Sequence, residues 1–193
     1  MNSILRKSIL GIAGLTVAGG LAAGPLNHDT TTPVRDTAVT TQAAKLDTAA
    51  LIPHGVQGTQ SHIDLDDEQT KNVKAIIAAT KKAGMDERAA VVSIATALQE
   101  SKLENLGHLG DRNDHDSQGL FQQRPSSGWG TVEQITDPEY STTAFLKGLK
   151  QVDGWQDMPL TVAAQTVQVS AYPDHYAQWE QQAADLVAEH WNS

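Results

Sequence analysis

One segment of the chain limits the possible folds more than any other: the apolar run that ends at Glu100. Asp86 is a candidate helix N-cap, because an aspartate side chain can accept a hydrogen bond from the free N–H groups of the first turn. The helix that would follow it is apolar on almost every side rather than along one stripe, at Ala90, Val91, Ile94, Ala95 and Leu98. A helix of this kind must be buried. The sequence therefore predicts a domain built around a central buried helix, with Glu100 where that helix leaves the core.

Other helix signals occur throughout residues 65–193. The acids Asp66–Glu68 open a helix whose last turn carries Lys81 and Lys82 before Gly84. Further starts are predicted at Thr131, at Asp137–Pro138, at Leu160 with Thr161 as a possible cap, and at Pro173–Asp174. No alternating strand pattern of useful length and no internal repeat is found. We predict an all-α domain of about six helices, with a small irregular hairpin as an alternative in the loop after Leu103.

The N-terminal residues have the pattern of an export signal. Arg6 and Lys7 precede an apolar run that ends in small residues before Pro25. We predict a signal peptide at residues 1–23, cleaved after Ala22 or Ala23, and a flexible linker at residues 24–64, rich in Thr, Ala and Asp. The protein would then be extracellular or in the cell wall. An uncleaved membrane anchor is the competing interpretation, although the run is short and interrupted by glycines.

Composition excludes several classes of partner. The chain carries a formal charge of −9 and has no cysteine, so neither disulfides nor thiol chemistry is available. An acidic chain is poorly suited to neutralising phosphates, which argues against nucleic acid and anionic lipid as partners. We expect a monomer with no stable membrane partner.

Glu100 is the candidate for acid catalysis. A carboxyl at the exit of a buried helix is partly desolvated, which raises its pKa, so it can hold a proton and give it to a leaving oxygen. The loop that follows is dense in Gly, Asp, Asn and His up to Ser117 and offers hydrogen-bonding groups. The competing interpretation is a surface glutamate that ends a helix.

Two ordered motifs resemble a known group of enzymes. Glu100–Ser101 followed by Gly119–Gln122 resembles the Glu-Ser … Gly-Leu-Met-Gln signature of soluble lytic transglycosylases and goose-type lysozymes. Gly110–Arg112 resembles a Gly-Asp-Arg of the goose-type enzymes, and Ala171–Tyr172 resembles part of an Ala-Tyr-Asn signature. The pattern, from about Asp66 to Trp191, is also similar to small secreted lysozyme-like domains of actinobacteria. The resemblance implies a lysozyme-like fold and cleavage of peptidoglycan glycan strands between N-acetylmuramic acid and N-acetylglucosamine.

The resemblance also implies roles for single residues. Glu100 would be the acid, and Asp111 a second catalytic carboxylate that positions water in a hydrolase. The residues expected to contact substrate are Ser101, Gln122, Gln123, Tyr172 and Trp129. Goose-type enzymes often carry another acid where this chain has Arg124, and this departure favours a lytic transglycosylase. Tyr172 would lie near Glu100, although Pro173 replaces the motif's Asn.

Other interpretations of the same residues remain. Ser101 could simply end a helix, and Tyr172 and Trp129 could belong to the core. The His and Asp residues at 108–116 do not have the spacing of a calcium loop and give a weak zinc signal, so we expect neither metal nor cofactor. A non-catalytic peptidoglycan-binding module with a lysozyme-like cleft is the alternative function, and a cell-envelope scaffold is a third.

Overall fold

A computed structural model describes residues 46–193. The predicted signal peptide and the first half of the predicted linker lie outside the described residues. Within them the fold is all-α, as predicted, and has no strand. The α-helices are α1 (Asp67–Lys82), α2 (Glu87–Ser101), α3 (Val132–Ile135), α4 (Pro138–Leu149), α5 (Leu160–Gln168) and α6 (Glu180–His190). No helix between residues 46 and 193 is long and apolar enough to cross a membrane.

Short 3-10 helices fill several of the connections between the α-helices. They are η1 (Thr48–Leu51), η2 (Gly110–Arg112), η3 (Pro125–Ser127), η4 (Trp155–Asp157) and η5 (His175–Trp179). The last of these, η5, runs directly into α6, so the predicted final helix begins as a tighter 3-10 turn.

The helix starts follow the capping chemistry of the sequence. Asp66 and Asp86 each accept a hydrogen bond from the backbone N–H three residues later, and Asp137 does the same at the start of α4. Thr131 forms a complete capping box with Gln134. Thr161 differs from the prediction because α5 begins at Leu160. Its hydroxyl lies inside the helix and donates to the carbonyl of Pro173 instead of capping.

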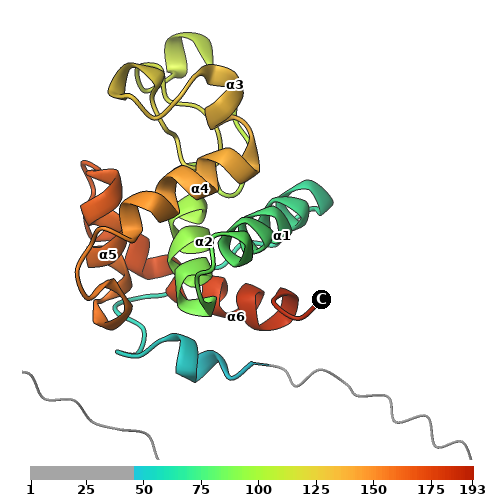
Figure 1. The fold of residues 1–193 in the computed structure, drawn as a ribbon, viewed down its shortest axis with the longest axis vertical. Coiled ribbons are helices and arrows are strands. Elements are labelled where there is room, and N and C mark those ends of the chain that lie inside the picture. The colour runs from blue at the N-terminus through green and yellow to red at the C-terminus, as the bar shows by residue number, and fades with distance from the viewer. Residues whose placement is uncertain (1–45) are drawn as a thin grey trace, which may run out of the picture. The chain divides into compact units, whose positions relative to one another are not determined.

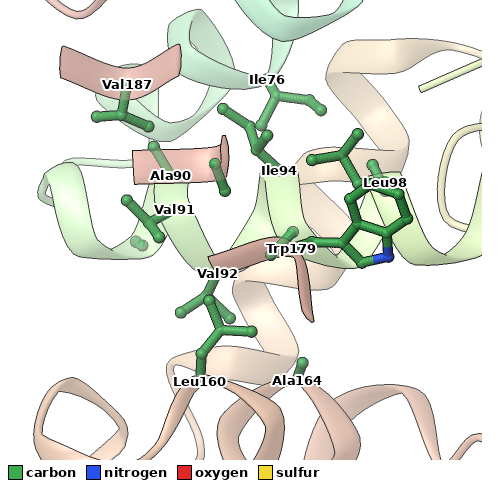
Figure 2. Packing of buried hydrophobic residues seen from close by; sticks show 14 of the residues in the cluster. Ile76, Ala90, Val91, Val92, Ile94, Leu98, Leu160, Ala164, Trp179 and Val187 are labelled. Atoms are coloured by element: carbon green, nitrogen blue, oxygen red, sulfur yellow. The ribbon is translucent and has the colours of Figure 1, made fainter. Parts of the chain in front are cut away.

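The predicted central helix is α2. Every residue from Ala89 to Leu98 is buried. Figure 1 shows α2 between the other long helices, and Figure 2 shows its apolar side chains between residues of α1, α5 and α6: Ile76, Leu160, Ala164 and Val187. Because the chain has no disulfide, this packing is the main source of stability that the structure offers.

A long irregular segment connects α2 to α3. Its single β-bridge, between Gln118 and Gln123, encloses the Gly119–Gln122 turn and corresponds to the irregular hairpin considered above. Gly119 has φ +77°, and an added Cβ there would lie 2.1 Å from the carbonyl oxygen of Ile135. The turn is therefore packed so closely against α3 that only glycine fits. Phe121 is buried and stacks on Phe145 of α4, which makes it a core residue.

Several of residues 46–64 contact the domain, which differs from the flexible linker that the sequence predicts, while residues 53–59 are exposed. Leu51 and Ile52 are buried in the core, and the backbone N–H of Ser61 donates to the carbonyl of Gln178 at 2.7 Å. The buried guanidinium of Arg88 donates to the carbonyl of Leu51 at 2.9 Å and to Glu180 at 2.7 Å. This segment has few apolar residues and no helical periodicity, because its order comes from contacts with distant parts of the chain.

Candidate active site

The side chains of Gln99, Glu100 and Ser101, in the last turn of α2, have three different environments. Gln99 accepts hydrogen bonds from Trp179 and Gln178, at 2.9 and 3.0 Å. Glu100 faces a cleft, as described below. Ser101 is buried, and its hydroxyl is hydrogen-bonded to the carbonyl of Leu120 at 2.9 Å. The helix ends immediately afterwards, because the next residue has a left-handed backbone.

Ser101 does not line the cleft, so the prediction that it contacts substrate is not supported by its position. Its hydroxyl also reaches the carbonyl of Ala97 one turn earlier, at 3.1 Å. The bond to Leu120 joins the end of α2 to the middle of the Gly119–Gln122 turn. The Glu-Ser pair therefore has two functions in the fold. Glu100 places its carboxyl in the cleft, and Ser101 holds the neighbouring turn.

The cleft beside Glu100 has a volume of about 680 Å³. Two segments of the chain form most of it. We call residues 114–129 the loop wall and residues 167–176 the helical wall, which runs from the end of α5 into η5. The cleft is lined by Gln99, Glu100, Asp114, Ser117, Gln122, Gln123, Arg124, Ser127, Trp129 and Val167–Tyr172.

The Glu100 carboxyl is held from the helical wall. The Tyr176 hydroxyl donates to its Oε1 at 2.6 Å, and the Gln168 amide lies 3.4 Å from the same oxygen. The same amide group donates to the carbonyl of Phe121 at 2.8 Å, which links the two walls. Tyr176 is fully buried and its pKa is raised by burial and by Glu100, so it remains a proton donor.

The pKa of Glu100 is raised above its usual value of 4.5. Burial is the main cause, because it disfavours the charged carboxylate. The hydrogen bonds from Tyr176 and Gln168 and the charge of Lys102 oppose this shift, and the negative charge of Asp114 adds to it. The result is a half-buried carboxyl, open to a cleft, that keeps its proton at higher pH than an exposed glutamate.

Tyr176 takes the place that the sequence assigned to Tyr172. Tyr172 does line the cleft, but it is 61% exposed and stacks on His175 at 4.9 Å instead of approaching Glu100. The Ala-Tyr resemblance predicts Tyr172 near Glu100, whereas the tyrosine that is hydrogen-bonded to Glu100 is Tyr176 of η5. Gln168 was missed altogether. No local pattern identifies it, since its two acceptors are 68 and 47 residues away in the sequence.

Asp111, the predicted second carboxylate, lies away from the cleft. It belongs to η2 and is exposed. Asp114 does line the cleft. Asp114 is paired with Arg124 at 2.5 Å and with His115 at 2.7 Å. The hydrogen bond from His115 is the main cause that lowers the pKa of Asp114, so this carboxylate is ionised and already partnered.

The remaining predicted contact residues line the cleft, with different freedom to bind. Gln122 has φ +45°, and its amide donates to the carbonyl of Gly119 at 3.0 Å. The Gln123 amide nitrogen donates to the carbonyl of Ser141, and its amide oxygen is buried without a hydrogen-bond partner among the described residues, so neither atom is exposed to a ligand. Trp129 lines the cleft at the far end of the loop wall.

Between residues 46 and 193, no three His, Asp or Glu side chains come together in a way that could hold a metal ion. In comparisons with known proteins, no protein-family model matches this chain and no curated protein matches its sequence.

Proposed function

We propose that this chain is an exported peptidoglycan-cleaving enzyme that cuts the β-1,4 bond between N-acetylmuramic acid and N-acetylglucosamine. The observation that carries the proposal is Glu100, a half-buried carboxyl with a raised pKa at the edge of a cleft of about 680 Å³. Glycoside cleavage needs an acid that keeps its proton and can give it to the leaving oxygen. The pattern of residues 1–23 supports export, since peptidoglycan lies outside the membrane.

A lytic transglycosylase is favoured over a hydrolase. Inverting hydrolysis requires a second carboxylate that is free to activate water. Asp111 lies away from the cleft, and Asp114 is already paired with Arg124 and His115. A single carboxyl suffices for the transglycosylase reaction, because the nucleophile is a hydroxyl of the substrate itself.

In the proposed reaction Glu100 acts twice. Its proton goes to the glycosidic oxygen as the bond from that oxygen to C1 of the muramyl residue breaks. The resulting carboxylate then takes the proton from the muramyl O6 hydroxyl as O6 bonds to C1, which leaves a 1,6-anhydro ring and restores the protonated acid. Tyr176 stabilises the carboxylate between these two steps, through the 2.6 Å hydrogen bond to Oε1.

The test is mass spectrometry of the products from purified peptidoglycan, with the Glu100→Gln variant beside the unaltered protein. We expect 1,6-anhydro muropeptides, lighter by one water than hydrolysis products, from the unaltered protein. We expect a loss of about 100-fold or more with Glu100→Gln, because a positioned general acid contributes roughly that factor. Hydrated products would favour a hydrolase. Equal lysis by the two proteins would remove Glu100 from the mechanism.

Folding of the variant is checked by its stability against pH. The pKa of the Glu100 carboxyl is higher in the folded protein than in the unfolded chain, where it is 4.5. Such a carboxyl destabilises the folded state as the pH rises above the pKa of the unfolded chain. Glutamine does not ionise. Glu100→Gln should therefore match the unaltered protein at low pH and be the more stable of the two at neutral pH. A variant that is less stable at every pH would show that lost activity reflects damage to the fold.

A further inference from the structure

Arg124 stands out among the residues of the cleft. Of the described residues that line it, Arg124 is the only one with a permanent positive charge. The cleft otherwise presents carboxyl, amide, hydroxyl and aromatic groups, in a chain whose formal charge is −9. A cation placed there is expected to meet an anionic part of whatever the cleft binds.

Two bonds already fix the orientation of the Arg124 guanidinium. Its Nε donates to the hydroxyl of Ser117 at 3.0 Å, and its Nη2 donates to Asp114 at 2.5 Å. Its Nη1 makes no hydrogen bond to any residue within 46–193. A guanidinium carries more N–H groups than these two bonds use, so it keeps donors for a further acceptor while its plane is held.

The bond to Asp114 does not prevent Arg124 from binding a ligand. The Asp114 side chain is 71% exposed and that of Arg124 is 33% exposed, so solvent screens the pair. A second carboxylate can bind the N–H groups that remain while the bond to Asp114 stays in place.

We propose that Arg124 binds a carboxylate of the substrate and so selects acidic glycan strands over neutral ones. This inference rests on the proposed function. The forked guanidinium matches the planar carboxylate group, which makes arginine the residue suited to this contact. In peptidoglycan the carboxylate belongs either to the lactyl group of peptide-free muramic acid or to the stem peptide. Chitin has related sugars and the same type of linkage but carries no carboxylate.

The experiment measures binding rather than cleavage. The full chain with Glu100→Gln is titrated with four soluble glycans: peptide-bearing and peptide-free strands, each before and after chemical amidation of its carboxylates. Arg124→Gln is then introduced into this parent protein, and Arg112→Gln is introduced separately as the matched control. Arg112 is an exposed arginine of the same segment between α2 and α3, and it does not line the cleft. We expect Arg124→Gln to weaken binding to carboxylate-bearing strands by about tenfold or more, which is typical of a charge-assisted hydrogen bond.

The four glycans identify the source of the carboxylate. A loss confined to peptide-bearing strands points to the stem peptide, and one on peptide-free strands points to the lactyl group. Amidated strands should bind Arg124→Gln and the parent protein equally. The proposal is overturned if Arg124→Gln weakens binding to amidated strands by the same factor, if it changes nothing, or if Arg112→Gln weakens binding equally.

The conservative variant adds a second readout. Arg124→Lys keeps the charge but loses the planar fork, so it should recover only part of the binding lost in Arg124→Gln. Full recovery would reduce the role of Arg124 to that of a point charge. Anhydro products from the unaltered protein together with unchanged binding by Arg124→Gln would overturn this inference alone. Failure of the parent protein to bind any of the four glycans would count against both proposals.

Discussion

The loop wall and the helical wall line the same cleft but are stabilised in different ways. Tyr176, at the end of the helical wall, is fully buried in the core around α2, whereas residues 171–175 of the same wall are exposed. The loop wall has a buried stretch at residues 117–121, and its charged side chains are held by short polar contacts, such as those of Asp116 with Ser126 and of Arg124 with Ser117. The helical wall positions the Glu100 carboxyl, whereas the loop wall supplies Asp114 and Arg124 as charges around it.

In this site, the residues that position the carboxyl and the residues that supply charge around it come from different segments. A side chain that must hold an atom in place within a few tenths of an ångström benefits from a rigid, buried support. A charge that acts through the solvent of a cleft needs only approximate placement. Changes in the helical wall should therefore alter the position and pKa of the Glu100 carboxyl through direct contacts, and changes in the loop wall should alter binding and, more weakly, the pKa of Glu100 through charge, unless they disrupt the wall itself.

The largest effect is expected where the loop wall meets the core, at Gly119. Gly119→Ala combines a left-handed backbone with a Cβ only 2.1 Å from the carbonyl oxygen of Ile135. We expect a loss of about 3 kcal/mol in the free energy of unfolding, from backbone strain of about 1 kcal/mol and overpacking of about 2 kcal/mol. Denaturant unfolding measures it.

Gly128→Ala is the control for this variant. Gly128 has a similar φ of +83° but nothing within 4 Å of an added Cβ. It should cost only the backbone term, about 1 kcal/mol. If the two alanine variants lost the same stability, the close approach to Ile135 would not be what fixes the loop wall.

A smaller effect is expected in the helical wall, from Tyr176→Phe. The variant keeps the buried ring but removes the hydrogen bond that lowers the pKa of Glu100. The pKa of Glu100 should then rise. Because the proposed acid must be protonated, the fall of activity at alkaline pH should move to higher pH. The rate should decrease by about tenfold, since a hydrogen bond to a charged group is lost.

The matched control is Tyr172→Phe, which alters an exposed tyrosine of the same wall that makes no bond to Glu100. It should leave the pH profile unchanged. A shift with Tyr172→Phe, or none with Tyr176→Phe, would contradict the assignment of Tyr176 as the partner of the carboxyl.

The smallest effect is expected from Asp114→Asn in the loop wall. The negative charge of Asp114 raises the pKa of Glu100, and this effect is smaller than those of burial, Tyr176, Gln168 and Lys102. Its removal should move the alkaline fall of activity to lower pH, opposite in sign to Tyr176→Phe. Because Asp114 is largely exposed, the shift should shrink as salt is added. Asp111→Asn, outside the cleft, should produce no shift in the same assay.

The sequence predicted the core better than the site. Caps such as Asp66, Asp86 and Asp137 act within one turn, and the apolar run of α2 signals its own burial, so both can be recognised locally. The placement of Glu100 at the cleft followed from the end of that run.

The partners of Glu100 could not be predicted in the same way. Tyr176 and Gln168 reach it across 76 and 68 residues of sequence, and no local pattern distinguishes them from other core or helix-end residues. The same physical reason applies to residues 46–64. Their polarity is typical of a linker, and only contacts with distant residues, such as Gln178, order them.

The contact between Arg88 and Leu51 ties residues before α1 to the helical domain. Arg88 is buried and donates to the carbonyl of Leu51, to Glu180 and to the carbonyl of Met158. A protein trimmed at residue 65, the boundary that helical periodicity suggests, would remove one of these acceptors and uncover the apolar surface now covered by Leu51 and Ile52. Expression of the domain alone should therefore start before Asp47, whose side chain caps η1.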